Sequence, residues 1–317
     1  MDEQFDLRNL PWEVQPATGV GYGRAVSAAV QDFRSMLPEQ LLLDGGFGTS
    51  LMERGLDIAS EPTALWNLTH PEDVLAVHQS FASAGAGALQ TNTFGANRLA
   101  LLGRGAIDVR ECNLAAVRLA KEAAGPTTLV VGCIGPSAQI PPPQGDANLI
   151  DLEKAFAEQA SVLAEGGVDF LHIETMAHPK EMRAALRGSR EGAPNLAVVV
   201  SMSAKRVGAH YKTTQGFAVK SMIKVAKEER ANGVGANCML SPADMLDLTK
   251  MMVAECDVPV FAQPTIAPDG GAPLYPDEFA EGVAALFAAG AVAVGGCCGT
   301  GAKDLDSARR RLERGYR

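Results

Sequence analysis

The sequence predicts an α/β protein folded as a (β/α)8 TIM barrel. From residue 41 onward, short apolar runs alternate with turns and with alanine-rich stretches whose apolar residues recur at helical spacing. This alternation continues to the end of a chain of 317 residues. About eight such units match a closed barrel better than an open doubly wound sheet. We therefore expect parallel strands around a single core.

Each apolar run is short and is followed by glycine or polar residues, which is typical of a buried strand. The predicted strands are residues 41–43, 88–90, 129–131, 170–173, 197–200, 234–236, 258–261 and 292–294. The stretches between them, such as 152–164 and 278–289, carry the helical pattern. Residues 1–38 contain no clear strand and are predicted to form an N-terminal extension or arm, with a glycine run at 19–23 that fits a surface or oligomer contact. Residues 39–317 then form the barrel.

The composition excludes several classes of function. A net charge of -9 argues against a nucleic-acid or anionic-membrane partner, because no basic cluster is available to neutralise phosphates. The chain has no charge-free run of about 18 apolar residues, and its acidic start lacks the apolar segment of a secretory signal. We expect a soluble, cytoplasmic protein. In a reducing compartment its six cysteines are expected to be buried residues, metal ligands or nucleophiles rather than disulfides.

Polar residues follow the predicted strands, at the end of the barrel where this fold carries its functional groups. They are Asp44, Asn92, Gly135, Glu174, Ser201, Ser203, Cys238, Gln263, Cys297 and Cys298. Two acids, two amides and three cysteines are thereby placed on one rim. The alternative for the acids Asp44 and Glu174 is that each caps the helix after it.

Three of the cysteines are candidate metal ligands. Cys238 follows one strand and the adjacent pair Cys297 and Cys298 follows another, with glycines around the pair that allow a sharp turn. Three protein ligands with an open fourth position are a known way to hold a catalytic zinc ion. The spacing alone also allows small buried hydrophobes, the reading that we prefer for Cys112 and Cys256.

The first predicted strand is followed by the sequence Asp44-Gly45-Gly46-Phe47-Gly48-Thr49. Such a loop offers a carboxylate and free backbone N–H groups. It lacks the lysine of a phosphate-binding loop, so a carboxylate or amino-acid ligand fits it better. His172 lies inside a predicted strand and is expected to be a hydrogen-bonded core imidazole.

Four motifs together carry a specific likeness: residues 44–49, 91–94, 236–238 and 295–300. In this order they resemble the homocysteine S-methyltransferase family. That family includes betaine-homocysteine methyltransferase, S-methylmethionine-dependent enzymes and the homocysteine module of cobalamin-dependent methionine synthase. The likeness covers about residues 39–312 and leaves the N-terminal extension outside.

The resemblance implies a barrel that binds Zn²⁺ through three cysteines and takes the thiol of homocysteine at the open metal position. Transfer of a methyl group to that thiol would give methionine. Carried over to this sequence, the zinc ligands are Cys238, Cys297 and Cys298. The residues implied to bind or support homocysteine are Asp44 and Glu174 at its amino group, backbone amides near Gly45 and Gly46, and Asn92 and Asn237.

The methyl donor is left open by the resemblance, as a small molecule or a corrinoid carried by a separate protein. Gly95 and Thr175 stand where the betaine enzymes have aromatic residues, so an aromatic cage for a quaternary ammonium is not expected. Two alternatives remain: methyl transfer to another small thiol, or a non-catalytic amino-acid-binding barrel within a methyl-transfer complex. A metal-dependent hydrolase is disfavoured, because it would use histidine and carboxylate ligands.

Overall fold

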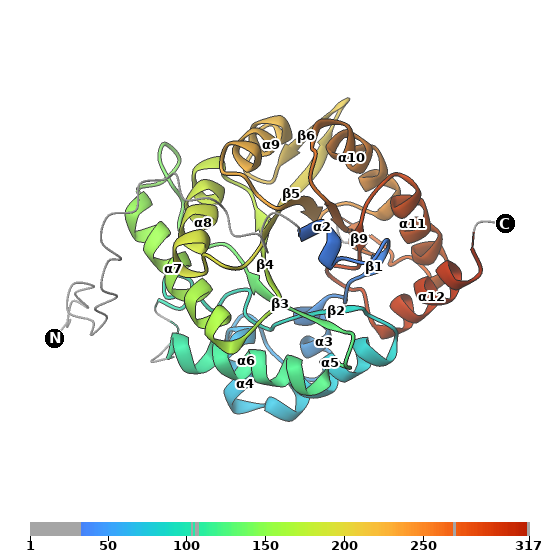
Figure 1. The fold of residues 1–317 in the computed structure, drawn as a ribbon, viewed down its shortest axis with the longest axis horizontal. Coiled ribbons are helices and arrows are strands. Elements are labelled where there is room, and N and C mark those ends of the chain that lie inside the picture. The colour runs from blue at the N-terminus through green and yellow to red at the C-terminus, as the bar shows by residue number, and fades with distance from the viewer. Residues whose placement is uncertain (1–32, 103, 105–107, 269–270, 316–317) are drawn as a thin grey trace.

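The computed structural model describes residues 33–102, 104, 108–268 and 271–315. Parallel strands curve around a central axis in the order β1-β9-β8-β7-β5-β4-β3-β2, with helices outside them (Figure 1). The ends of this series meet where Leu43 bridges Ala88 in parallel and the Gly87 N–H donates to Leu42 O at 2.8 Å. The predicted (β/α)8 barrel is confirmed. Its strands are β1 (Leu41–Leu42), β2 (Ala88–Gln90), β3 (Leu129–Ile134), β4 (Phe170–Met176), β5 (Val198–Val207), β7 (Gly233–Asn237), β8 (Val260–Gln263) and β9 (Ala293–Val294).

The helices begin at recognisable start signals. Side chains of Asp108, Asn148 and Ser241 accept hydrogen bonds from the first turns of their helices, and proline opens several others. The predicted helical stretches 152–164 and 278–289 correspond to α7 (Leu149–Gly166) and α11 (Pro276–Ala288), with ends that shift by a few residues because of these caps. The outer elements are α3 (Phe47–Met52), η2 (Thr63–Leu65), α4 (Trp66–Thr69), α5 (Pro71–Ser83), α6 (Val109–Ala123), α7 (Leu149–Gly166), α8 (Pro179–Gly192), α9 (Val219–Glu228), α10 (Pro242–Glu255), α11 (Pro276–Ala288) and α12 (Ala302–Glu313).

Alternate residues of each strand point into the barrel, and along β4 these inward residues change from apolar to polar. On β4, Phe170 points inward with the apolar cluster at the strand starts, while Leu171 packs outward against the helices. Further along the same inward face come His172 and Glu174, both buried. The lower, N-terminal half of the interior is therefore filled with hydrophobic side chains, and the polar residues lie above it.

A short helix, α2 (Phe33–Met36), lies across the lower end of the barrel (Figure 1). The Phe33 ring is 5.1 Å from that of Phe170 and 6.5 Å from that of Phe261, measured between centroids, and its side chain is buried. These aromatic contacts close the N-terminal mouth. The rest of the predicted extension, residues 1–32 with its glycine run, lies outside the described residues.

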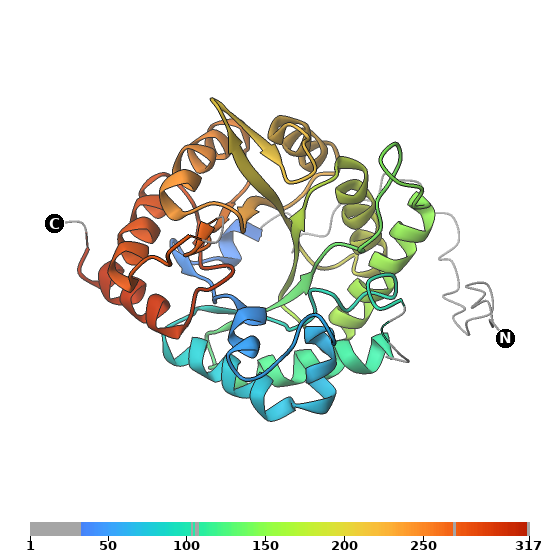
Figure 2. The same ribbon diagram turned by 180° about the vertical axis from the view of Figure 1, so that it is seen from behind.

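One strand pairing differs from the sequence prediction. β5 continues well beyond residue 200 and pairs antiparallel with β6 (His210–Thr213) as a hairpin that projects past the barrel (Figure 2). Its outer half carries exposed residues such as Lys205 and Arg206, so hydrophobicity marks only the buried half. In the described part of the chain, every helix is too short or too polar to traverse a bilayer.

Candidate metal centre and substrate pocket

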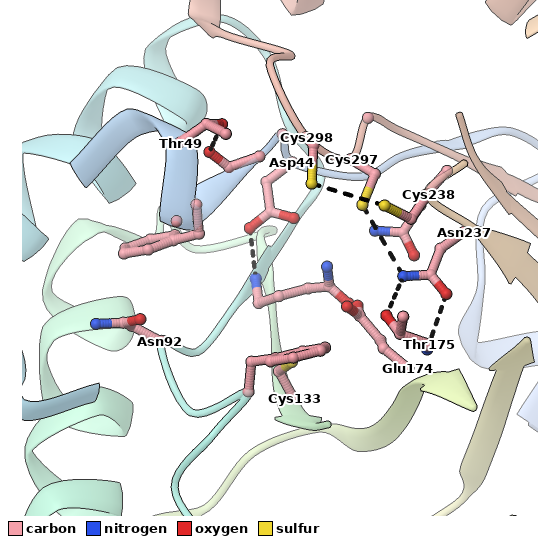
Figure 3. Close-up of a pocket in the computed structure, with 18 of the residues that line it drawn as sticks. Asp44, Thr49, Asn92, Cys133, Glu174, Thr175, Asn237, Cys238, Cys297 and Cys298 are labelled. Carbon is pink, nitrogen blue, oxygen red and sulfur yellow. Dashed lines mark hydrogen bonds between the residues drawn. The ribbon is translucent and has the colours of Figure 1, made fainter. Parts of the chain in front are cut away.

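A pocket opens at the C-terminal end of the barrel strands (Figure 3). It is lined by residues from the loops after β1, β2, β7 and β9 and by inward residues of β2, β3, β4 and β8. The lining includes Asp44, Gly45, Gly46, Phe47, Gln90, Asn92, Phe94, Cys133, Glu174, Thr175, Asn237, Cys238, Gln263, Cys297 and Cys298. Seven of the ten predicted rim residues are among them. Gly135, Ser201 and Ser203 do not line the pocket.

The three predicted metal ligands converge at one side of this pocket (Figure 3). Cys238, Cys297 and Cys298 bring their Sγ atoms within 4.8 Å of one another, and the Cys238 and Cys298 sulfurs are 3.6 Å apart. Tetrahedral zinc with Zn–S bonds of about 2.3 Å requires sulfurs separated by about 3.8 Å. The donor set and its spacing therefore fit a zinc ion.

The backbone around the cysteines is held in conformations that few side chains adopt. Cys238 has φ of 62°, and its N–H donates to Gln263 O at 3.0 Å. Cys297 N–H donates to Pro264 O at 2.8 Å, and Thr265 Oγ1 donates to Cys298 O at 2.8 Å. A left-handed backbone conformation at a residue other than glycine costs free energy, and it persists where surrounding contacts hold it in place. β8 and the loop after it supply those contacts.

The thiols interact strongly with one another. Hydrogen bonds from Cys238 and then Cys297 lower the pKa of Cys298 to about 3. The pKa of Cys297 is raised well above its ordinary value, because hydrogen bonds to Cys238 and Cys298 favour its protonated form and it is buried. The cluster thus stabilises one thiolate between two thiols, and a bound cation would favour ionisation of the others.

Asp44 lies at the edge of the pocket with a side chain that is only 1% exposed. Its Oδ2 accepts a hydrogen bond from the Gln90 backbone N–H at 2.7 Å, while Oδ1 has no hydrogen-bond partner among the described residues. Burial raises the pKa of Asp44 well above its ordinary value, and the nearby Glu174 raises it further. The helix α3 is capped by the Gly46 backbone, so the capping alternative for Asp44 is wrong.

Glu174 faces the same pocket from β4. Burial raises its pKa to about 7, although hydrogen bonds from Gln90 and Gln263 favour the ionised form. The cap of α8 is His178, so capping does not explain Glu174 either. Two buried carboxyl groups side by side, with oxygen atoms left unpaired by the described residues, favour a cationic ligand group between them.

Asn237 connects the acidic and sulfur sides of the pocket (Figure 3). Its Oδ1 accepts from the Thr175 N–H at 2.9 Å, and its Nδ2 donates to Thr175 Oγ1 at 2.8 Å. The same Nδ2 lies 4.0 Å from Cys297 Sγ. Thr175, next to Glu174 at an irregularity in β4, has φ of 61°. Asn237 thus stabilises a strained residue beside the acid.

The loop after β1 is joined directly to the cysteine loop. Gly46 N–H donates to Thr300 O at 2.9 Å, and Gly296 N–H donates to Asp44 O at 2.9 Å. A Cβ on Gly45 would lie 2.5 Å from Thr300 O, and one on Gly46 would lie 2.5 Å from Cys297 O. The Gly46 amide is occupied by this contact, whereas the Gly45 amide has no hydrogen-bond partner among the described residues.

Asn92 is braced by its neighbours at the pocket wall. Its Nδ2 donates to Thr63 O at 2.8 Å and to Asn67 Oδ1 at 3.0 Å, while Asn67 donates back to Asn92 O at 2.9 Å. The aromatic side chains in the lining are Phe47 and Phe94.

The sequence reasoning did not single out Gln90, which lies beneath both acids. It is the last residue of β2, and a polar residue at an inward strand position was the available signal. The expectation for His172 is confirmed: Nδ1 is 2.8 Å from Gln90 Oε1, and Nε2 is 2.7 Å from Ser201 Oγ. Cys133, also buried, lines the pocket close to Glu174.

Residues 41–312 match the model of a family described as homocysteine S-methyltransferase. The methionine synthase of Mycobacterium tuberculosis (strain ATCC 25618 / H37Rv) is 29% identical in an alignment of 297 positions that covers 85% of this chain and 24% of that protein. Betaine--homocysteine S-methyltransferase 1 of Bos taurus is 28% identical over 219 residues, 68% of this chain and 52% of that protein. This chain thus spans about a quarter and about half of these relatives.

Among solved structures, the metallated form of the homocysteine methyltransferase MmuM from Escherichia coli superposes with a TM-score of 0.71 at 22% identity. The match covers 86% of this chain and 96% of that one. At this identity the likeness supports the fold.

Proposed function

This chain belongs to the homocysteine S-methyltransferase family, and on that premise we propose that it transfers a methyl group to the thiol of homocysteine to give methionine. One observation carries the proposal: three cysteine sulfurs converge beside two buried carboxyl groups in one pocket. Homocysteine is a short molecule with a thiol at one end and an ammonium group at the other. The two halves of the pocket match its two ends.

We propose that Cys238, Cys297 and Cys298 hold a zinc ion. The sulfur spacing and the low pKa of Cys298 both suit a divalent metal. A bound zinc ion would lower the pKa of the incoming thiol, so that the nucleophilic thiolate is present at neutral pH. Asn237, close to Cys297 Sγ, would orient this ligand from outside the metal sphere.

Asp44 and Glu174 would bind the ammonium group of homocysteine. An opposite charge near a carboxyl group favours its ionised form, so the substrate would offset the burial that raises the pKa of both acids. Gly45, next to Asp44, also lines the pocket, and its N–H is proposed to meet the substrate carboxylate. Anchoring the amino-acid end fixes the direction of the sulfur. Binding energy is thereby used to orient one reactant toward the other, which accelerates a reaction between two substrates.

The methyl donor is proposed to approach from the solvent side, as a small methylated compound or a corrinoid on another protein. The lining contains the phenylalanines Phe47 and Phe94 but neither tyrosine nor tryptophan. A multi-ring cage for a quaternary ammonium ion is therefore not formed by the described lining residues. This composition favours a donor other than betaine.

The test is to incubate zinc-loaded protein with homocysteine and a panel of donors and to measure methionine by mass spectrometry. The panel contains S-methylmethionine, betaine and methylcobalamin. We expect one zinc ion per wild-type chain and methionine formation with at least one donor. Cys298→Ala should lose both. Cys256→Ala, at the end of α10 and remote from the pocket, is the matched control. A wild-type protein without zinc, or full activity of Cys298→Ala, would contradict the proposal.

A further inference from the structure

We propose that His172 is a positioning residue that fixes the side-chain amide of Gln90, so that the amide NH₂ group faces Asp44 and Glu174. The inference rests on the proposed function, because it assigns these acids to the substrate ammonium group. The residues concerned form a buried layer beneath the binding site and are not proposed to touch the substrate.

The layer is a continuous chain of hydrogen bonds across three strands. Ser201 Oγ on β5 lies 2.7 Å from His172 Nε2 on β4, and His172 Nδ1 lies 2.8 Å from Gln90 Oε1 on β2. Ser201 and His172 are fully buried, and Gln90 is 8% exposed. The Gln90 side chain lies close enough to Asp44 and Glu174 to lower the pKa of both carboxyl groups, against the effect of burial. A group at the barrel centre is thereby linked to both acids.

The partners of His172 determine which ring nitrogen carries the proton. Nδ1 faces two acceptors, Gln90 Oε1 at 2.8 Å and Glu174 Oε1 at 3.3 Å. Whichever way the Gln90 amide is turned, a bare Nδ1 would set its lone pair against the Glu174 carboxylate oxygen, so the proton belongs on Nδ1. Nε2 then accepts a hydrogen bond from the Ser201 hydroxyl, which can donate or accept. Burial lowers the pKa of His172 to about 3, which keeps the ring neutral.

This tautomer selects one orientation of the Gln90 amide. The Nδ1–H donor requires the amide oxygen of Gln90 to face the histidine, and the NH₂ group is then directed toward the acids. The Gln90 backbone N–H also donates to Asp44 Oδ2 at 2.7 Å. With the amide reversed, its oxygen would face two carboxyl groups and disfavour their ionisation. His172 therefore prepares Asp44 and Glu174 as carboxylates for a cationic ligand.

The consequence falls on binding of the amino-acid end and not on the sulfur chemistry. His172→Leu removes the N–H while keeping an apolar side chain of moderate size. Hydrogen bonds to charged groups contribute about 1.5–3 kcal/mol, so we expect the KM for homocysteine to rise about 10- to 100-fold with little change in kcat. His172→Asn places an amide N–H near the position of Nδ1 and should restore most of the loss.

A second acceptor separates positioning from general damage to the pocket. The acceptor 4-mercaptobutanoate has the thiol and carboxylate of homocysteine but no amino group. Its KM should be nearly the same for wild type and His172→Leu. An unchanged homocysteine KM in His172→Leu, or an equal rise for both acceptors, would overturn the inference.

Nitrogen-15 NMR of histidine-labelled, zinc-loaded protein tests the layer without any turnover. The His172 signals, identified by their loss in His172→Asn, should show a protonated Nδ1 and a bare Nε2 at neutral pH. The reverse tautomer, or a doubly protonated ring, would overturn the inference even if the enzyme is active. Absence of methionine formation by wild type would instead count against the proposed function. The measured tautomer of His172 would still decide whether His172 orients the Gln90 amide as proposed.

Discussion

The contact between the loop after β1 and the cysteine loop makes Gly46→Ala an informative substitution. Gly46 has φ of −72° and ψ of 91°, which alanine adopts freely, so any effect is steric. The added Cβ would lie 2.5 Å from Cys297 O and 2.6 Å from Thr49 Oγ1. Ordinary contact needs about 3.4 Å or more, and although the Thr49 side chain can turn away, the contact with the Cys297 backbone is relieved only by moving one loop against the other. Relief should therefore displace Cys297, a proposed metal ligand.

Overpacking of this kind costs about 1–3 kcal/mol of unfolding free energy. A displaced ligand should also weaken zinc binding about 10- to 100-fold, the range found when groups that orient a ligand are lost. Urea unfolding of the metal-free protein measures the first effect, and competition with a chromophoric chelator measures the second.

Gly48→Ala is the matched control, two residues further along the same loop. Its Cβ would meet Thr63 Cγ2 at 3.7 Å and nothing closer, and it lies inside α3. Alanine at a helical position should be neutral or stabilising by up to about 1 kcal/mol. If Gly46→Ala bound zinc as tightly as Gly48→Ala and unfolded at the same urea concentration, the two loops would not be coupled as described.

Three further predictions concern the acids, the metal and a buried histidine. Glu174→Gln should raise the homocysteine KM about 10-fold or more by removing one carboxylate, with the KM for 4-mercaptobutanoate nearly unchanged; an equal effect on both acceptors would contradict ammonium binding. Removing zinc with a chelator should lower the melting temperature of wild type but not of Cys298→Ala, as measured by calorimetry; identical shifts would argue against the cysteine site. Burial lowers the pKa of His78 to about 3, so between there and the unfolded value of 6.5 the unfolded chain binds the extra proton and acid destabilises the fold. Relative to wild type, His78→Leu should gain about 1.4 kcal/mol of unfolding free energy per pH unit of acidification below about pH 6, and a pH-independent difference in urea titrations would refute this.

The barrel and the approximate rim could be predicted because both follow from local patterns. Apolar runs mark the strands, and the residue after each run lies at the C-terminal rim whatever its neighbours are. This rule places Asp44, Cys238, Cys297 and Cys298 on one face of the barrel. The exposed half of β5 and its partner β6 have no such apolar signal.

The layer beneath the pocket could not be predicted, because it depends on register between strands far apart in the chain. Gln90 and His172 are 82 residues apart, and Ser201 follows 29 residues later. Nothing local to any of them indicates which other strand it will meet. The same holds for the contact of Gly46 with the cysteine loop, since it joins opposite ends of the barrel sequence.

The aromatic closure formed by Phe33, Phe170 and Phe261 has a kinetic consequence. These buried rings fill the lower end of the barrel, and the described pocket lies at the opposite end, where reactants would enter and products would leave. The two acids are almost fully buried while Cys298 is exposed, which puts the amino-acid end of the substrate innermost. Under the proposed function, homocysteine has to arrive before the donor, and methionine is the last to depart.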